Sequence, residues 1–220
     1  MLALFLLMAC TSDDTGDTAS GQPLLLKSPP EGTTYRYAVH ATGGDSLHWP
    51  GSFAEGWYKG TDYTEVVLGD FSVVHPKGVR AYVDLGDGTS ADVAIRAVQV
   101  WGGEEEYPNL EYVFDPAAVL QLDGHLLNET LTVEPTGEFL VNGETHALDL
   151  QIAYTLTGTN DAIDVPYNRV QGCWTWNIVV TEQGFDKETR LSVKSKLGLV
   201  RVDWLPGNFT EIELEDVITP

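Results

Sequence analysis

The stretch Glu138-Phe-Leu-Val-Asn-Gly-Glu-Thr-His-Ala-Leu148 decides the fold of this chain. Two short segments flank Asn142-Gly143, and Asn-Gly between such segments is the strongest short-range signal for a two-residue hairpin. A second pair, Val79–Leu85 and Ala91–Val100, flanks Gly86-Asp87-Gly88 in the same way. The sequence therefore predicts antiparallel strands that follow one another along the chain.

Segments of the same kind occur along the rest of the chain. They comprise Thr33–Val39, Tyr63–Leu68 and Phe71–Val74 around Gly69-Asp70, Val119–Leu122 and Leu126–Val133 around Asp123-Gly124, Leu150–Leu156, Cys173–Thr181, Thr189–Val193, Leu197–Trp204 and Glu211–Ile218. Alternation places Tyr35, Tyr37 and Val39 on one face of the first segment. A short helix is expected only over Asp115–Leu120, where Asp115 would cap and Pro116 would begin the helix.

These segments predict an all-β fold of about ten to twelve strands. Consecutive antiparallel strands favour an up-and-down barrel or half-barrel over a Greek-key sandwich, with at most one or two short helices.

The N-terminal residues predict where the protein resides. Met1–Ala9 is apolar and too short to span a bilayer, which needs about 20 residues. Leu7-Met-Ala-Cys10 resembles the bacterial lipobox, in which a diacylglycerol is attached to the cysteine. We expect a signal peptide at 1–9, a lipidated Cys10 opening an acidic leash over 10–23, and one β-rich domain over 24–220.

The resemblance to lipoproteins also implies a location. Thr11 stands where an Asp commonly retains Gram-negative lipoproteins at the inner membrane, so the expected site is the cell envelope, more specifically the outer membrane. An ordinary cleaved signal peptide and a cytosolic protein are the other two interpretations. No Lys or Arg precedes the apolar run, although signal peptides usually carry one.

The composition is strongly acidic, with 33 Asp and Glu against 12 Lys and Arg and a net charge of −21. Such a surface repels nucleic-acid phosphates and anionic headgroups, so neither is an expected direct partner. Solubility explains the charge most simply, with calcium or a cationic partner as alternatives. Asp84–Asp92 lacks the calcium-loop pattern and is expected to be a hairpin turn, and Glu104–Glu106 a solvated loop.

The residues that most often carry chemistry form no enzyme signature. The five histidines are scattered, and no catalytic residue, metal site or cofactor is predicted. With Cys10 lipidated, Cys173 has no disulfide partner and is expected to be a small buried residue. An intermolecular disulfide and a nucleophilic thiolate remain the alternatives.

Aromatic residues give the only candidate for a ligand site. Trp49, Phe53, Trp57 and Tyr58 lie in the Pro- and Gly-containing stretch His48–Tyr58, which is expected to be a loop. Aromatic side chains in such a loop either close the open end of a barrel or stack on a ligand. Trp174 and Trp176 share a strand face by alternation and are expected in the core.

Three stretches resemble a group of uncharacterised exported bacterial lipoproteins whose curled sheet is similar to that of the LolA/LolB lipoprotein carriers. They are Leu24–Val39, Val165–Trp174, and Leu197–Trp204 followed by Thr210–Leu214. The second lacks the Ala-Gly pair of that group, and Gly60–Asp161 shows no match. The resemblance implies a curled sheet with Cys173 in the core, and no residue roles.

Two functions are compatible with these features. The first is a non-catalytic, lipid-anchored envelope protein that binds an apolar or amphipathic ligand on the concave face of a curled sheet. The second is a structural or interaction lipoprotein with a filled barrel and a protein partner in the envelope.

Overall fold

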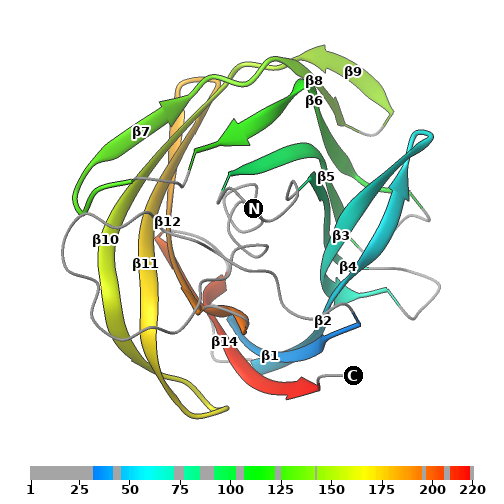
Figure 1. Ribbon diagram of the computed structural model, residues 1–220. Helices are drawn as coiled ribbons and strands as arrows, with labels where there is room; N and C mark the ends of the chain where they lie inside the picture. The colour runs from blue at the N-terminus through cyan, green and yellow to red at the C-terminus, as the bar shows by residue number, and fades with distance from the viewer. Residues whose placement is uncertain are drawn as a thin grey trace.

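A computed structural model describes residues 32–41, 46–71, 77–84, 92–102, 107–121, 125–141, 143–194, 197–205 and 209–218. They form a single 14-stranded antiparallel sheet, and none of these residues is helical. The sheet is curled but not closed, which confirms the predicted all-β half-barrel (Figure 1). No helix that could cross a membrane occurs among the described residues.

The strands are, in chain order, β1 (Thr34–Ala41), β2 (Ser46–Tyr58), β3 (Thr61–Asp70), β4 (Lys77–Asp84), β5 (Val93–Gly102), β6 (Leu110–Leu120), β7 (Thr130–Val133), β8 (Gly137–Val141), β9 (Glu144–Ala147), β10 (Leu150–Asp164), β11 (Arg169–Glu182), β12 (Phe185–Lys194), β13 (Gly198–Leu205) and β14 (Phe209–Ile218).

The strand order is β7-β10-β11-β12-β13-β14-β1-β2-β3-β4-β5-β6-β8-β9. Two up-and-down runs therefore meet where β14 pairs with β1, from Thr34 opposite Ile218 to Ala41 opposite Phe209. Figure 1 shows β10 to β12 on one side of the curl and β2 to β6 on the other, with β14 and β1 between them. The predicted final strand over the acidic tail is confirmed as β14.

β7 departs from the up-and-down order. It pairs with β10, with Val133 opposite Ile152, although the sequence predicts a hairpin with the preceding strand around Asp123-Gly124. That hairpin prediction is wrong, because the partner of β7 is β10 and not the strand before it. In this position Leu131 and Val133 pack against the main core. By contrast, the hairpin around Asn142-Gly143 is confirmed, with Val141 of β8 opposite Glu144 of β9.

Side chains and loop backbone bridge the two ends of the curled sheet. The Tyr112 hydroxyl on β6 donates to Glu182 Oε1 on β11 at 2.7 Å. The Gln121 backbone N–H donates to the Tyr154 hydroxyl on β10 at 3.0 Å, and that hydroxyl donates to the Gln121 carbonyl at 3.2 Å. We call these two contacts the seam bridges, because β6 is not a neighbour of β10 or of β11 in the hydrogen-bonded sheet.

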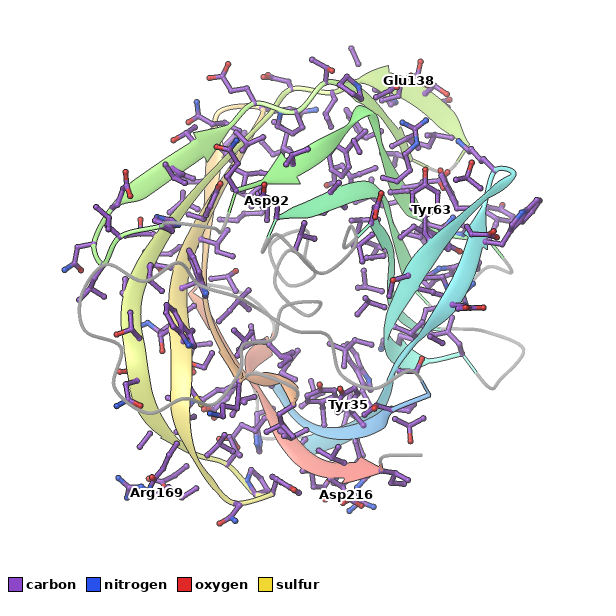
Figure 2. The ribbon with its side chains drawn as sticks, in the orientation of Figure 1. Tyr35, Tyr63, Asp92, Glu138, Arg169 and Asp216 are labelled. Atoms are coloured by element: carbon purple, nitrogen blue, oxygen red, sulfur yellow. The ribbon has the colours of Figure 1, made fainter. Side chains whose placement is uncertain are left out.

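The inward-facing side chains form one large hydrophobic cluster that draws on both runs of strands. Its largest fully buried members include Trp176, Tyr154 and Phe114, and Trp174 packs against it while partly buried. Tyr37 and Val39 of β1 belong to it, with Tyr35 packed against it, which confirms their shared face. Figure 2 shows the exposed Arg169 and Glu138 at the outside of the ring.

The stretch His48–Tyr58 is not a loop but most of β2, so the sequence-based expectation is wrong there. Gly51 allows the Tyr37 ring to pack closely against β2, since a Cβ on Gly51 would lie 2.8 Å from that ring. Pro50 precedes the residues of β2 that pair with β3, which begin at Gly51, so a proline is tolerated there.

The expected short helix over Asp115–Leu120 is also wrong, because these residues end β6. Ala118 and Leu120 are buried and Val119 is exposed, which is the period of a strand. The pairing with β5 shifts between Ile95 and Ala97, which places Asp115 in a bulge. There its carboxylate pairs with Arg96 at 3.2 Å instead of capping a helix.

Gly69-Asp70 does not form the predicted two-residue hairpin, because both residues belong to β3. Gly69 lies opposite Gly78 of β4, and a Cβ on either glycine would collide with the backbone of the other strand. The two glycines therefore allow the backbones of β3 and β4 to approach closely at this point. The pairing of β4 with β5 confirms the other predicted hairpin, whose connecting residues lie outside the described part.

Candidate functional site

The structure does not bring together the three candidate aromatic side chains that it describes, Trp49, Trp57 and Tyr58. Trp49 is buried in the main core, whereas Tyr58 is buried in a separate small cluster with Tyr82 and Ala97. Trp57, at the end of β2, is 69% exposed. The side chain of Phe53 lies outside the described part, so the predicted ligand site stays a prediction.

Tyr58 of β2 is held by contacts with side chains of β4, β5 and β6. Its ring stacks on Tyr82 with centroids 4.7 Å apart, and its hydroxyl donates to Glu111 Oε1 at 2.9 Å. Gln99 donates to the same oxygen at 2.8 Å. Burial, followed by the charge of Glu111, raises the pKa of Tyr58 above its usual range. These contacts describe a packed structural residue and not an accessible stacking platform.

Charged side chains gather on the outer face where the two runs of strands meet. We call this set the charged row; it comprises Arg201 and Asp203 on β13, Glu211, Glu213 and Glu215 on β14, Arg36 and His40 on β1, and His48 on β2. The intervening Ile212 and Leu214 of β14 are buried in the core. Alternation along β14 thus places glutamates outside and aliphatic residues inside.

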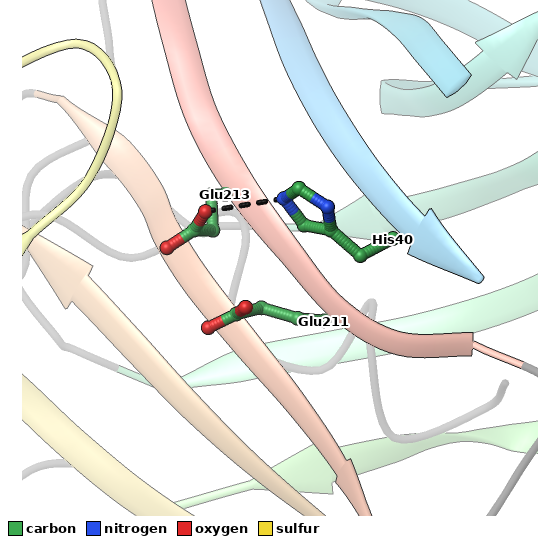
Figure 3. Close-up of side chains that lie close together, drawn as sticks. All are labelled: His40, Glu211 and Glu213. Carbon is green, nitrogen blue, oxygen red and sulfur yellow. Dashed lines mark hydrogen bonds and ion pairs between the residues drawn. The ribbon is translucent and has the colours of Figure 1, made fainter. Parts of the chain in front are cut away.

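One end of the charged row resembles a cation site in its ligand types. His40, Glu211 and Glu213 offer three ligand atoms that lie within 4.8 Å of one another, and His40 Nε2 is 3.3 Å from Glu213 Oε2 (Figure 3). An imidazole with two carboxylates could ligate zinc or a similar ion. No sequence pattern indicates this cluster, because His40 is about 170 positions from the two glutamates and only the β14–β1 pairing brings them together.

Arg201 already forms ion pairs with both carboxylates of this cluster. Its guanidinium pairs with Glu211, lies 3.6 Å from Glu213 Oε1, and contacts Asp203 Oδ1 at 2.9 Å. A cation would have to displace it from two of its three partners. Burial, followed by the charge of Glu213, raises the pKa of Glu211 above its ordinary value. We interpret the cluster as an ion-pair network that joins β13, β14 and β1.

Cys173 is a fully buried free thiol on β11. It packs with Val170 and Val200 in a small cluster separate from the main core. Burial raises the pKa of the thiol to about 11, which leaves little thiolate at neutral pH. This environment matches the expected structural residue and is unsuited to a nucleophile.

A compact turn after β6 projects two leucines outward. Leu126 and Leu127 are 61% and 52% exposed, while the preceding His125 is buried. The Leu126 N–H donates to Glu129 Oε2 at 3.1 Å, and the Asn128 N–H donates to the Leu156 carbonyl of β10 at 2.7 Å. We call residues 125–129 the leucine turn. No sequence pattern indicates this turn, because its residues resemble part of a strand.

Several predicted features lie outside the described residues. They are the lipidated Cys10 with its signal peptide and leash, Glu104–Glu106, and the interior of the acidic stretch Asp84–Asp92. These remain predictions.

Comparison with known proteins gives one distant likeness. No protein-family profile matches the sequence, and no curated protein sequence matches it. A crystal structure from Bacteroides fragilis shows a protein inferred to be exported, with a YmcC-like fold; the match spans 92% of this chain and 100% of that protein's chain. The sequence identity is 10% and the TM-score is 0.46. A likeness this remote leaves the function to be argued from the residues of this chain, and the LolA/LolB-like resemblance stays a prediction.

Proposed function

We propose that this chain is a non-catalytic, lipid-anchored protein of the cell envelope whose packed sheet presents a fixed outer surface to a protein partner. The observation that carries the proposal is the filled interior: inward-facing side chains of both runs pack into one cluster. A ligand on the concave face would have to displace fully buried residues such as Trp176 and Tyr154. The packing therefore favours the interaction protein over the carrier of an apolar ligand.

The leucine turn is the best candidate for the contact with that partner. Adjacent exposed leucines are unusual on a surface as acidic as this one, and hydrogen bonds hold their backbone in place. A rigid apolar pair loses little conformational entropy on binding. A partner with a shallow apolar pocket would fit it.

The test is cross-linking of the lipidated protein in its own membranes. We expect one reproducible cross-linked protein, and its yield should fall at least about tenfold in the double variant Leu126→Ser/Leu127→Ser. Phe185→Ser, at a 74% exposed aromatic residue on β12, is the matched control and should not reduce the yield. An unchanged yield in the double variant would remove the leucine turn from the proposal. A clean monomer that never cross-links would overturn the proposed function.

Mass measurements separate the remaining parts of the proposal. The intact mass should equal residues 10–220 plus two or three acyl chains, and Cys10→Ala should release the protein from the membrane. Native mass spectrometry should detect no tightly bound lipid. A stoichiometric bound lipid would instead support the apolar-ligand hypothesis, and an unlipidated chain would remove the anchor.

A further inference from the structure

Two of the buried side-chain nitrogen atoms that have no hydrogen-bond partner among the described residues lie in adjoining rings. They are Nδ1 of His125 in the leucine turn and Nε1 of Trp176 on β11. Trp176 is fully buried and His125 is 8% exposed, so bulk water does not satisfy either atom. The ring centroids of the two residues lie 4.9 Å apart, with the planes at 57°.

The chemistry of the two atoms is complementary. His125 Nε2 lies 2.8 Å from the Glu129 carbonyl oxygen, which can only accept, so Nε2 carries the proton of the neutral ring. Nδ1 is then an acceptor, while the indole Nε1–H of Trp176 is only a donor. A group that donates to one and accepts from the other would satisfy both, and a hydroxyl does this with a single oxygen.

Among the described side chains that pack on both rings, Tyr154 carries a hydroxyl, but it does not supply that group. The Tyr154 ring packs against both His125 and Trp176, at 5.5 Å and 6.2 Å between centroids. Its only proton is donated to the Gln121 carbonyl, in one of the seam bridges. The tyrosine hydroxyl therefore has no proton left for His125 Nδ1.

We propose that His125 and Trp176 form an enclosed binding site for one hydroxyl group, from a water molecule or from the alcohol of a small organic ligand. A hydroxyl oxygen with two hydrogen bonds of about 3 Å in a roughly tetrahedral arrangement spans about 5 Å. The two rings that carry Nδ1 and Nε1 adjoin, with their centroids 4.9 Å apart. The bridge fastens the leucine turn to the core through His125. The site is independent of the proposed partner.

The test is nuclear magnetic resonance on the full-length chain in detergent micelles, with ¹⁵N-labelled tryptophan and histidine. The six indole N–H signals are few enough to resolve, and Trp176 is assigned from its contacts with the rings of His125 and Tyr154. We expect the Trp176 N–H to show a cross-peak to a long-lived hydroxyl. A cross-peak at the water frequency identifies water; one elsewhere, with added mass in native mass spectrometry, identifies an organic alcohol.

Two results would overturn the site. One is a ¹⁵N–¹⁵N coupling between the two rings, which reports a direct hydrogen bond from Trp176 to His125. The other is the absence of any hydroxyl cross-peak. In His125→Phe we further expect solvent exchange of the Trp176 N–H to become at least about tenfold faster. His146→Phe, at an exposed histidine on β9, is the matched control. The wild-type spectra decide the question even if His125→Phe fails to fold.

Discussion

The environment of Cys173 determines how its thiol reacts. Because burial raises the pKa to about 11, the thiolate population at pH 8 is about two orders of magnitude below that of an ordinary cysteine. We expect Cys173 in the folded protein to resist iodoacetamide, and to react quickly once denaturant exposes it. Peptide mass mapping at position 173 measures both rates. Equal rates in the two states would contradict the buried position.

Arg201 is the shared partner of three carboxylates on the outer face, so its loss should leave them repelling one another. We expect Arg201→Met to lower the free energy of unfolding by about 1 to 2 kcal/mol, between the values typical of exposed and buried pairs. Urea denaturation measures this loss, and high salt should reduce it.

Two further variants separate the network from a metal site. Adding Glu211→Gln to Arg201→Met should recover part of the lost stability, because it removes one of the opposed charges. Arg201→Met should also gain affinity for zinc, since the guanidinium no longer competes for Glu211 and Glu213. Tight zinc binding by the wild-type chain, as strong as by the variant, would contradict the role given to Arg201.

Individual residues show which parts of the core and of the candidate site the sequence predicts. Alternation correctly put Tyr37, Val39 and Trp176 in the core, because the period of a strand is local. It could not relate His40 to Glu213, since that contact requires β14 to pair with β1. Nor could it distinguish the buried Trp49 from the exposed Trp57, because both have the same parity along β2 and only Trp49 packs in the core cluster.

At the scale of elements, the seam bridge from β6 to β11 should contribute to stability. Tyr112→Phe removes only the hydroxyl that donates to Glu182, and a hydrogen bond to a charged group is typically worth about 1.5 to 3 kcal/mol. We expect a loss of that size in urea denaturation. Tyr167→Phe, at an exposed tyrosine between β10 and β11, should cost much less. Equal losses would show that the bridge does not stabilise the sheet.

The same bridge predicts a pH dependence. Burial raises the pKa of Glu182, but hydrogen bonds from Lys187 and Tyr112 outweigh it and hold that pKa below its ordinary value. The stabilisation is therefore fully present above the pKa of an unfolded glutamate, about 4.3, and is lost as the pH falls through the lower folded value. Glu182→Gln should flatten the stability curve below about pH 4.3. An unchanged acid limb would contradict this assignment.

Elements that depend on neighbouring residues in the sequence were predictable, and those that depend on contacts between distant residues were not. The β8–β9 hairpin followed from Asn142-Gly143 alone. β2 was missed because Pro50 and Gly51 are ordinary loop signals. In the structure Gly51 leaves space for a tyrosine ring, and Pro50 lies just before the pairing with β3 begins. β7 was assigned the wrong partner because its pairing with β10 depends on how the whole sheet curls.

At the scale of the whole molecule, one shared core predicts that the two runs of strands unfold together. Leu68 on β3 and Leu214 on β14 are fully buried in the same cluster, although they belong to different runs. Each change to alanine should cost about 2 to 5 kcal/mol and shift one common transition. Val119→Ala, at an exposed residue of β6, should have little effect.

The measurement is urea denaturation followed by far-ultraviolet circular dichroism and by tryptophan fluorescence, since both runs carry buried tryptophans, Trp49 on β2 and Trp176 on β11. Coincident curves in the wild type and both leucine variants are expected for a single cooperative unit. Each run alone would expose the apolar face that the other now covers, so neither should persist as an intermediate. Two separate transitions, each sensitive to only one leucine, would mean that the β14–β1 pairing joins two independent bodies. A sheet divided in that way would weaken the proposal that the protein acts as one rigid surface.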